Sequence, residues 1–147
     1  MILAIDIGNT NIVLGGLEGE KILFEARMAT DLIKTSDQYC AELKSMLALF
    51  EVTPEVISGS IISSVVPPVL NSFKTAIRKL TGKACLVVGP GIRTGLNIRM
   101  ENPAEVGSDL IVAAVAAIAE YGAPLLLVDM GTATTIAFCF FHALKNP

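Results

Sequence analysis

Length, composition and charge together exclude several classes of protein. The chain has 147 residues, of which 52% are hydrophobic and 5% aromatic, and its formal net charge is −3. This acidic balance argues against a protein that binds nucleic acid or an anionic membrane through electrostatic attraction. The apolar residues are mostly Ile, Val, Leu and Ala, which suits a sheet covered by helices, so we expect an α/β protein.

The sequence predicts no membrane-spanning or targeting segment. Its longest uninterrupted apolar run, Leu110 to Ala119, is too short to cross a bilayer as a helix. The first residues lack a basic region, and Asp6 interrupts their apolar stretch, so we expect no signal peptide. The three cysteines are widely spaced and form no CxxC pair. They predict reduced thiols in a cytoplasmic protein rather than a zinc site or a disulfide framework.

The start of the chain predicts three antiparallel strands. Gly8 and Asn9 tolerate positive φ angles, so they can form the turn of a hairpin between the first two strands. The third strand follows a second turn that contains Gly19. The predicted strands are Ile2–Ile5, Ile12–Leu14 and Lys21–Met28.

Helices and strands are expected to alternate along the rest of the chain. Capping residues and prolines mark where each helix begins, and glycines follow two of the helix ends. The predicted helices run from about Gln38 to Phe50 after the cap Thr35–Asp37, from Pro68 past Leu80 with Gly82 just after the end, and from a first turn at Asn102–Glu105, broken by Gly107, to Gly122. The predicted strands are Val56–Val66, the short buried strand Ala84–Val88, and Leu125–Val128.

Two passages of the chain share one pattern. LAIDIGNTNIVL and LLVDMGTATTIA each consist of an apolar strand, an Asp, one apolar residue, a Gly, a short polar stretch containing Thr, and a further strand. A turn of this kind exposes backbone N–H groups that bind phosphate oxygens without side-chain charge. Asn9, Thr10 and Thr132 can add amide and hydroxyl hydrogen bonds. We therefore expect a duplicated unit that holds a phosphate group between the two turns.

Asp6 and Asp129 stand at the ends of the strands that lead into these turns. Asp6 follows a strand that looks buried, and an unpaired buried charge is costly, so it needs a metal, a partner or water. Neither carboxylate is expected to touch the phosphate directly, because like charges repel. Both can hold a cation that bridges to the phosphate, often through water as Mg²⁺ prefers. We thus predict Asp6 as a metal or water partner beside a phosphate.

The order of elements and the paired turns resemble the actin, Hsp70 and sugar-kinase superfamily, whose two similar domains close over ATP. Four segments are similar, in order and spacing, to motifs of the type III pantothenate kinase family within it, over residues 1 to about 136. They are IDIGNTNIVLG, ISSVVP, TGLNIRMENPAEVGSDLIVAAVAA and VDMGTATTI. The resemblance implies an actin-like (ribonuclease H-like) lobe with a mixed sheet, three antiparallel strands and flanking helices. It also implies ATP-dependent phosphorylation of the 4′-hydroxyl of pantothenate, the first step towards coenzyme A. A cytoplasmic homodimer that needs Mg²⁺ and a monovalent cation, K⁺ or NH₄⁺, is implied as well.

The resemblance also carries roles over to particular residues of this chain. Asp109 falls on the proton acceptor and Asp129 on the position that binds the monovalent cation, while Asp6 is our candidate for holding Mg²⁺ through water. The pantothenate-contacting segment corresponds to Gly107, Ser108, Asp109 and Leu110. The ATP-binding motifs correspond to Asp6, Ile7, Gly8, Asn9, Thr10, Asn11, Ile12, Val13 and Thr132.

The sequence departs from the family pattern at two places. Family members usually carry Arg where this chain has Leu110, and a Leu cannot replace the hydrogen-bond donors of a guanidinium. After Ile136 the family continues through most of a second domain, whereas this chain reads AFCFFHALKNP and stops. We accordingly predict a first lobe over residues 1–122 and a truncated start of a second lobe over residues 123–147. As written, the chain is expected to have little or no pantothenate kinase activity.

Other interpretations of these residues stay open from the sequence alone. Asp109 can be an early-helix acid that interacts with the helix dipole, and Thr132 to Thr135 can be an ordinary turn between strands. Arg93 and Arg99 can contact an anionic ligand or lie on a solvated surface. For the whole chain, the alternatives to a kinase are a catalytically inactive nucleotide-binding or regulatory protein and a nucleotide-dependent phosphatase or ATPase of the same superfamily.

Overall fold

The computed structural model describes residues 1–89, 91–99, 106–131 and 134–140. Contacts between residues divide the chain into two compact units, Met1–Gly89 and Pro90–Pro147. The lobe boundary that we predicted after residue 122 stays a prediction.

The first unit is built on a five-stranded mixed sheet in the order β3-β2-β1-β4-β5. Antiparallel pairing joins β1 to β2 and β2 to β3, while β4 runs parallel to β1 and β5 parallel to β4. The strands are β1 (Ile2–Ile7), β2 (Asn11–Glu18), β3 (Lys21–Ala29), β4 (Gly59–Ser64) and β5 (Leu86–Val87). The predicted three antiparallel strands and mixed sheet are therefore confirmed.

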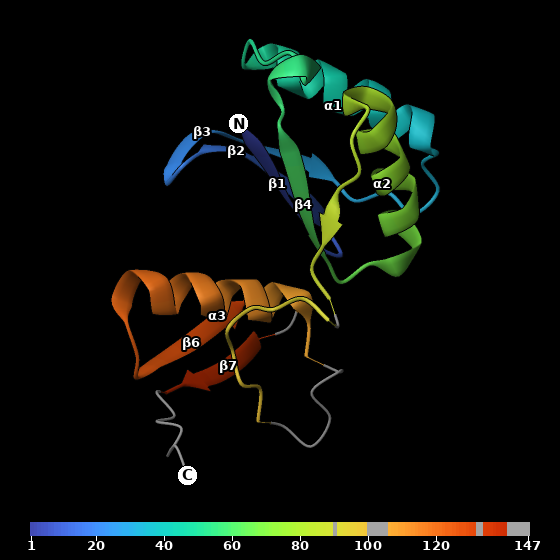
Figure 1. Cartoon of the computed structure of the whole chain (residues 1–147). Coiled ribbons are helices and arrows are strands. Elements are labelled where there is room, and N and C mark those ends of the chain that lie inside the picture. The colour runs from blue at the N-terminus through green and yellow to red at the C-terminus, as the bar shows by residue number, and fades with distance from the viewer. Residues whose placement is uncertain (90, 100–105, 132–133, 141–147) are drawn as a thin grey trace. The chain divides into compact units, whose positions relative to one another are not determined.

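Two helices, α1 (Ser36–Leu49) and α2 (Pro67–Thr81), pack against each other on one face of this sheet (Figure 1). Thr35 begins α1 as predicted: its hydroxyl accepts the N–H of Gln38, and the Gln38 side chain accepts the N–H of Thr35 at 2.9 Å. This reciprocal capping box satisfies two backbone donors that the helix leaves unpaired. Gly82 ends α2 with a φ of 71°, a left-handed conformation that favours glycine.

The hydrophobic core lies between the sheet and the two helices. Side chains alternate along a strand, so every second residue of β1 enters the core. The largest fully buried side chains among the described residues come from β1, β2, β4, both helices and the loop before β4. They are Leu3, Ile7, Ile12, Leu14, Tyr39, Leu43, Leu47, Ile57, Ile62, Val69, Phe73 and Ile77. The core cluster thus belongs to the first unit.

Two predicted strands are shorter in the structure than the sequence suggested. We predicted a strand over Val56–Val66, but a short 3₁₀ helix, η1 (Pro54–Val56), comes first and β4 begins only at Gly59. Pro54 has a fixed φ and no N–H, which suits the first turn of a helix better than a strand. The predicted buried strand Ala84–Val88 is reduced to β5, and Leu86 in it is exposed. As the last strand of the order, β5 has a sheet neighbour on one side only.

The second unit contains helix α3 (Ser108–Tyr121) and the antiparallel hairpin of β6 (Leu125–Met130) and β7 (Thr134–Cys139), against which α3 packs (Figure 1). Gly107 directly precedes α3, where the longer helix was expected to begin, and Gly122 ends it with a φ of 77°. The predicted first turn at Asn102–Glu105 lies outside the described residues. No helix in the described parts of the chain is long and apolar enough to cross a membrane.

One face of the hairpin is apolar and exposed. Leu126 pairs with Phe138, and Val128 pairs with Ile136, so all four side chains stand on the same side of the two strands. Each is exposed, from 48% for Val128 to 66% for Ile136. This face has the character of an interface, because soluble monomers rarely leave such a patch uncovered.

Gly16 in β2 should be much less tolerant of a side chain than its neighbour Gly15. A Cβ at Gly16 would lie 2.3 Å from Cε1 of Phe24, whose buried ring stacks on Phe50, whereas a Cβ at Gly15 meets nothing closer than 3.8 Å. We expect Gly16→Ala to lower the free energy of unfolding by about 1–3 kcal/mol, since an overpacked core must shift. Gly15→Ala should change it by less than about 0.5 kcal/mol.

Urea unfolding of the two variants, followed by circular dichroism, measures both values. Equal midpoints for Gly16→Ala and Gly15→Ala would contradict the packing of Phe24 described above.

Candidate functional site

The first predicted phosphate-binding turn joins β1 to β2. The N–H of Gly8 donates to the carbonyl oxygen of Asn11 at 3.0 Å, which closes the turn. Asn9, Thr10 and Asn11 are exposed at its tip. The neighbouring Ile7 and Ile12 are fully buried in the core. Any contact of these two isoleucines with a ligand must therefore use the main chain.

Gly8 is needed for close approach rather than for its backbone angle. We expected positive φ angles at Gly8 and Asn9, and this expectation is wrong: neither residue adopts one. A Cβ on Gly8 would instead lie 3.2 Å from the carbonyl oxygen of Asn11, which is closer than an ordinary van der Waals contact. A side chain at this position would thus require the Asn11 carbonyl group to shift by a few tenths of an ångström.

Thr30, directly after β3, holds the turn from the side. Its N–H donates to the carbonyl oxygen of Thr10 at 2.9 Å, and its hydroxyl donates to the carbonyl oxygen of Gly8 at 2.6 Å. The sequence analysis missed this residue. Asn11 and Ala29 are partners in the register of β2 and β3, so the strand pairing places the residue after Ala29 beside the turn. A Thr two residues after the predicted strand Lys21–Met28 was the available signal.

Asp6 is exposed, which overturns the argument that its charge is buried. Leu3, Ile5 and Ile7 of β1 face the helices, and the period of two puts Asp6 on the opposite side of the sheet together with Ile2 and Ala4. In register, Asp6 stands between Val13 of β2 and Ser63 of β4. Its carboxylate therefore needs no metal to compensate for burial, but it does stand one residue before the turn.

The predicted substrate segment forms the start of α3. Gly107 is the residue before the helix, Ser108 is buried, and Asp109 and Leu110 are half-buried in the first turn. Oδ1 of Asp109 accepts the N–H of Leu110 at 2.8 Å. A carboxylate in this position also interacts favourably with the helix dipole, so the alternative interpretation of Asp109 stays open.

The second predicted turn is described only in part. Asp129 is half-buried near the end of β6 and pairs in register with Thr135 of β7. Thr132 lies outside the described residues. Arg93 and Arg99 are exposed.

No group of three or more His, Cys, Asp and Glu side chains that could hold a metal occurs among the residues with described positions. A single exposed carboxylate such as that of Asp6 remains compatible with the predicted role, because Mg²⁺ commonly takes only one or two carboxylates and completes its shell with water and substrate phosphates.

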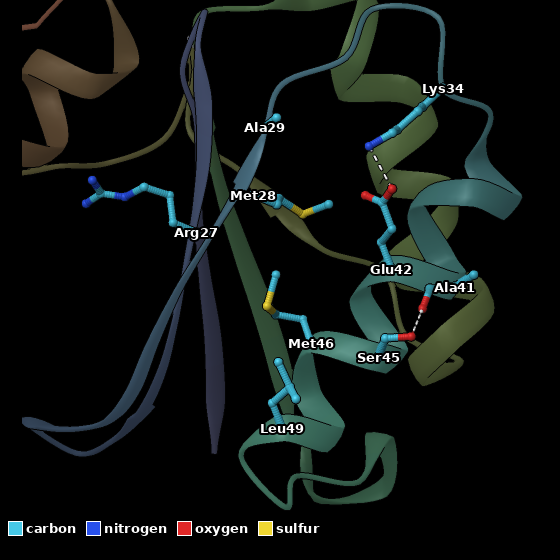
Figure 2. A pocket seen from close by; sticks show the side chains of 9 residues that line it. All are labelled: Arg27, Met28, Ala29, Lys34, Ala41, Glu42, Ser45, Met46 and Leu49. Atoms are coloured by element: carbon cyan, nitrogen blue, oxygen red, sulfur yellow. Dashed lines mark hydrogen bonds and ion pairs between the residues drawn. The ribbon is translucent and has the colours of Figure 1, made fainter.

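A groove of about 510 Å³ lies between β3 and α1, and its β3 wall pairs in register with Asn11, Ile12 and Val13 of the predicted ATP-binding motif. Figure 2 shows Met28 and Met46 on its walls, while the side chain of Arg27 points away from α1. Nζ of Lys34 lies 2.7 Å from Oε1 of Glu42, and this hydrogen bond raises the pKa of Lys34. The groove is lined by Arg27, Met28, Ala29, Lys34, Ala41, Glu42, Ser45, Met46 and Leu49. None of these residues was predicted to bind a ligand.

Comparison with known proteins identifies the family. The sequence model of type III pantothenate kinase matches residues 2–140. A type III pantothenate kinase of Listeria welshimeri is 48% identical over 144 residues, which cover 98% of this chain and 55% of the relative. A type III pantothenate kinase of Exiguobacterium is 49% identical, over 99% of this chain and 57% of the relative. One of Brevibacillus brevis is 51% identical, over 95% of this chain and 54% of the relative.

The chain thus spans a little more than half the length of the curated relatives it matches. The family match covers the turn at Gly8, the start of α3 and the segment with Asp129 and Thr132, which are the three segments in which the sequence analysis placed its site residues. The chain belongs to the type III pantothenate kinase family.

Proposed function

We propose that this protein transfers a phosphoryl group from ATP to the 4′-hydroxyl of pantothenate, the first step of coenzyme A synthesis. The observation that carries the proposal is the identity of 48–51% to proteins named type III pantothenate kinase, over 95–99% of this chain. The products are ADP and 4′-phosphopantothenate, with the hydroxyl proton passed to a base.

The proposed fold of the first unit is an actin-like, ribonuclease H-like ATPase lobe. Three antiparallel strands followed by parallel strands, with helices inserted between them in the chain, support this assignment. In such a lobe the turn between β1 and β2 faces the nucleotide. The exposed Asn9, Thr10 and Asn11 meet that requirement, whereas Ile7 and Ile12 anchor the turn in the core.

In this proposal the turn binds the phosphates of ATP together with Val13 and with Thr132 from the second motif. Backbone N–H groups and short polar side chains suit this role, because phosphate oxygens are acceptors only. We propose that Asp6 holds Mg²⁺ through water; its exposure and its position one residue before the turn support this role. When bound there, Mg²⁺ would neutralise charge on the transferring phosphoryl group.

Asp109 is the proposed general base. Phosphoryl transfer depends mainly on positioning and charge stabilisation, and a carboxylate that accepts the proton of the attacking alcohol completes these requirements. Gly107, Ser108 and Leu110 are proposed to contact pantothenate beside it. The hydrogen bond from the N–H of Leu110 fixes one oxygen of Asp109 and leaves the other available for the substrate hydroxyl.

Asp129 is proposed to bind the monovalent cation, K⁺ or NH₄⁺. Its half-buried carboxylate and its register partner Thr135 provide oxygen donors at one end of the hairpin. We further propose that the protein is a cytoplasmic homodimer, as the family resemblance implies. Nothing in the proposal calls for nucleic acid or a membrane.

A chimera tests the function and the role of Asp109 together. This chain replaces the matching segment of the Listeria welshimeri relative, so that the remaining part of the fold is supplied. We expect the chimera to phosphorylate pantothenate with ATP, and Asp109→Asn to lower kcat by about 10²–10⁴-fold, the usual contribution of a general base. Coupled detection of ADP measures turnover, and a fluorescent ATP analogue measures binding.

The unmodified Listeria protein is the control for this assay. A folded chimera without ATP-dependent phosphorylation of pantothenate would refute the proposed function. Near-normal turnover by Asp109→Asn would leave the function standing but remove Asp109 as the base.

Gly8→Ala should weaken nucleotide binding in the same chimera. The added Cβ must push the carbonyl oxygen of Asn11 away from 3.2 Å, which widens the turn that receives the phosphates. We expect the dissociation constant of the ATP analogue to rise by roughly tenfold, equivalent to about 1.4 kcal/mol. Gly15→Ala in β2 is the matched control, because its Cβ meets no close neighbour. Equal affinity in the two variants would show that the width of the turn does not matter for binding.

Removal of potassium should lower turnover of the chimera. Replacement of K⁺ by tetramethylammonium at constant ionic strength leaves the Asp129 carboxylate without a cation that fits its oxygens, so activity should fall and return when NH₄⁺ is added. Asp129→Asn should abolish the difference between the two salts. Equal turnover in potassium and tetramethylammonium would contradict the proposed cation site.

A further inference from the structure

The turn at Gly8 is held by contacts that no motif of the sequence indicated. Thr30 binds two of its carbonyl oxygens, those of Gly8 and Thr10, at 2.6 Å and 2.9 Å. A trans peptide is planar, and its N–H points opposite to the preceding C=O. The N–H groups of Asn9 and Asn11 therefore point away from Thr30, because the carbonyl groups before them point towards it.

Thr30 is itself held by a buried residue of α1. The hydroxyl of Tyr39 accepts the N–H of Asp31 at 3.2 Å and donates to the carbonyl oxygen of Asp31 at 2.7 Å. Tyr39 is fully buried, and its ring meets Phe73 edge-on with centroids 5.1 Å apart. The connection between β3 and α1 is thus fixed in the core at the residue that follows Thr30.

The side chain of Asp31 stiffens the same connection. Its Oδ1 accepts the N–H of Ile33 at 3.0 Å, a local turn that Asp side chains commonly form. The chain then reaches Thr35, which begins α1 through its capping box. A continuous set of hydrogen bonds therefore runs from the buried part of α1 to the exposed turn.

We propose that Thr30 is a positioning residue that orients the N–H groups of Asn9 and Asn11 towards the phosphates of ATP, and that Tyr39 fixes Thr30 through the backbone of Asp31. This inference rests on the proposed function of the turn. Carbonyl oxygens repel phosphate, so a turn that could rotate its peptide planes would lose affinity. When the binding-competent conformation is populated only in part, apparent affinity falls by that fraction.

The variant that tests the proposal is Thr30→Val in the chimera. Valine keeps the shape of threonine and its backbone N–H but removes the hydroxyl that binds Gly8. We expect the KM for ATP to rise about three- to tenfold, as loss of one hydrogen bond allows, with kcat and the KM for pantothenate changed by less than about twofold. Thr30→Ser keeps the hydroxyl and should restore the KM for ATP.

Thr75→Val is the matched control. The Thr75 hydroxyl also donates to a backbone carbonyl, that of Asn71 at 2.9 Å, but it lies on the exposed side of α2. This variant loses the same kind of bond without touching the turn, so its KM for ATP should equal that of the unmodified chimera. A second readout is hydrogen–deuterium exchange of peptides covering residues 7–11 without ligand, which should quicken in Thr30→Val only.

Tyr39→Phe tests the second half of the proposal. It keeps the ring against Phe73 and removes both bonds to Asp31. We expect a smaller rise in the KM for ATP than in Thr30→Val, and no further rise when both substitutions are combined, because they act on one chain of contacts. Full additivity of the two effects would overturn the proposed coupling.

The outcomes separate this inference from the function on which it rests. An active chimera whose KM for ATP is the same in Thr30→Val and Thr75→Val would overturn the role of Thr30 and leave the kinase assignment intact. A folded chimera without phosphorylation would overturn both. If Thr30→Val raises the KM for ATP and Thr30→Ser raises it equally, the Thr30 hydroxyl is not the group that positions the turn.

Discussion

Strand β1 buries one face in the core and ends its other face with an exposed carboxylate, and the rest of the first unit is arranged around that difference. Its inward side chains, Leu3, Ile5 and Ile7, are buried against α1 and α2. Its outward face ends in the exposed Asp6, one residue before the turn. Burial of the apolar face stabilises the strand by roughly 1.5–3 kcal/mol per side chain. The core thereby fixes the position from which the polar turn projects.

The turn and the start of α3 show two ways to place polar groups. The turn is shaped by contacts distant in the sequence, from Thr30 and through it from Tyr39. Asp109 is oriented by its own helix, through the N–H of the next residue. A substitution in the core near Tyr39 can therefore alter the turn, whereas Asp109 depends mainly on the local geometry of α3.

Local patterns predicted much of the fold. The cap at Thr35, the glycine at 82 and the breaks at 107 and 122 were placed correctly, because each depends on neighbouring residues alone. The three antiparallel strands followed from their turns for the same reason. The sequence analysis did not consider the effect of Pro54, and the strand expected from Val56 begins only at Gly59.

The candidate site was predicted less completely. The apolar run around Asp6 suggested burial, but alternation along the strand exposes this residue. The glycine of the turn was expected for its φ, whereas the structure needs it for space beside Asn11. Thr30 was missed because its contacts depend on the register of β2 with β3, which no local pattern reveals. The roles proposed for Asp109 and Asp129 came from family resemblance, because chemistry alone left them open.

The position of the core along the chain bears on how the protein is made. All core-cluster residues lie between Leu3 and Ile77, ahead of the hairpin that exposes Leu126 and Phe138. Ribosomes release a chain from its N-terminus at about 5–20 residues per second, and units complete in sequence can fold as they emerge. The first unit can therefore collapse during synthesis, several seconds before that apolar hairpin leaves the exit tunnel. If strands β1 to β4 have paired before the apolar hairpin of β6 and β7 leaves the ribosome, these strands cannot mispair with that hairpin.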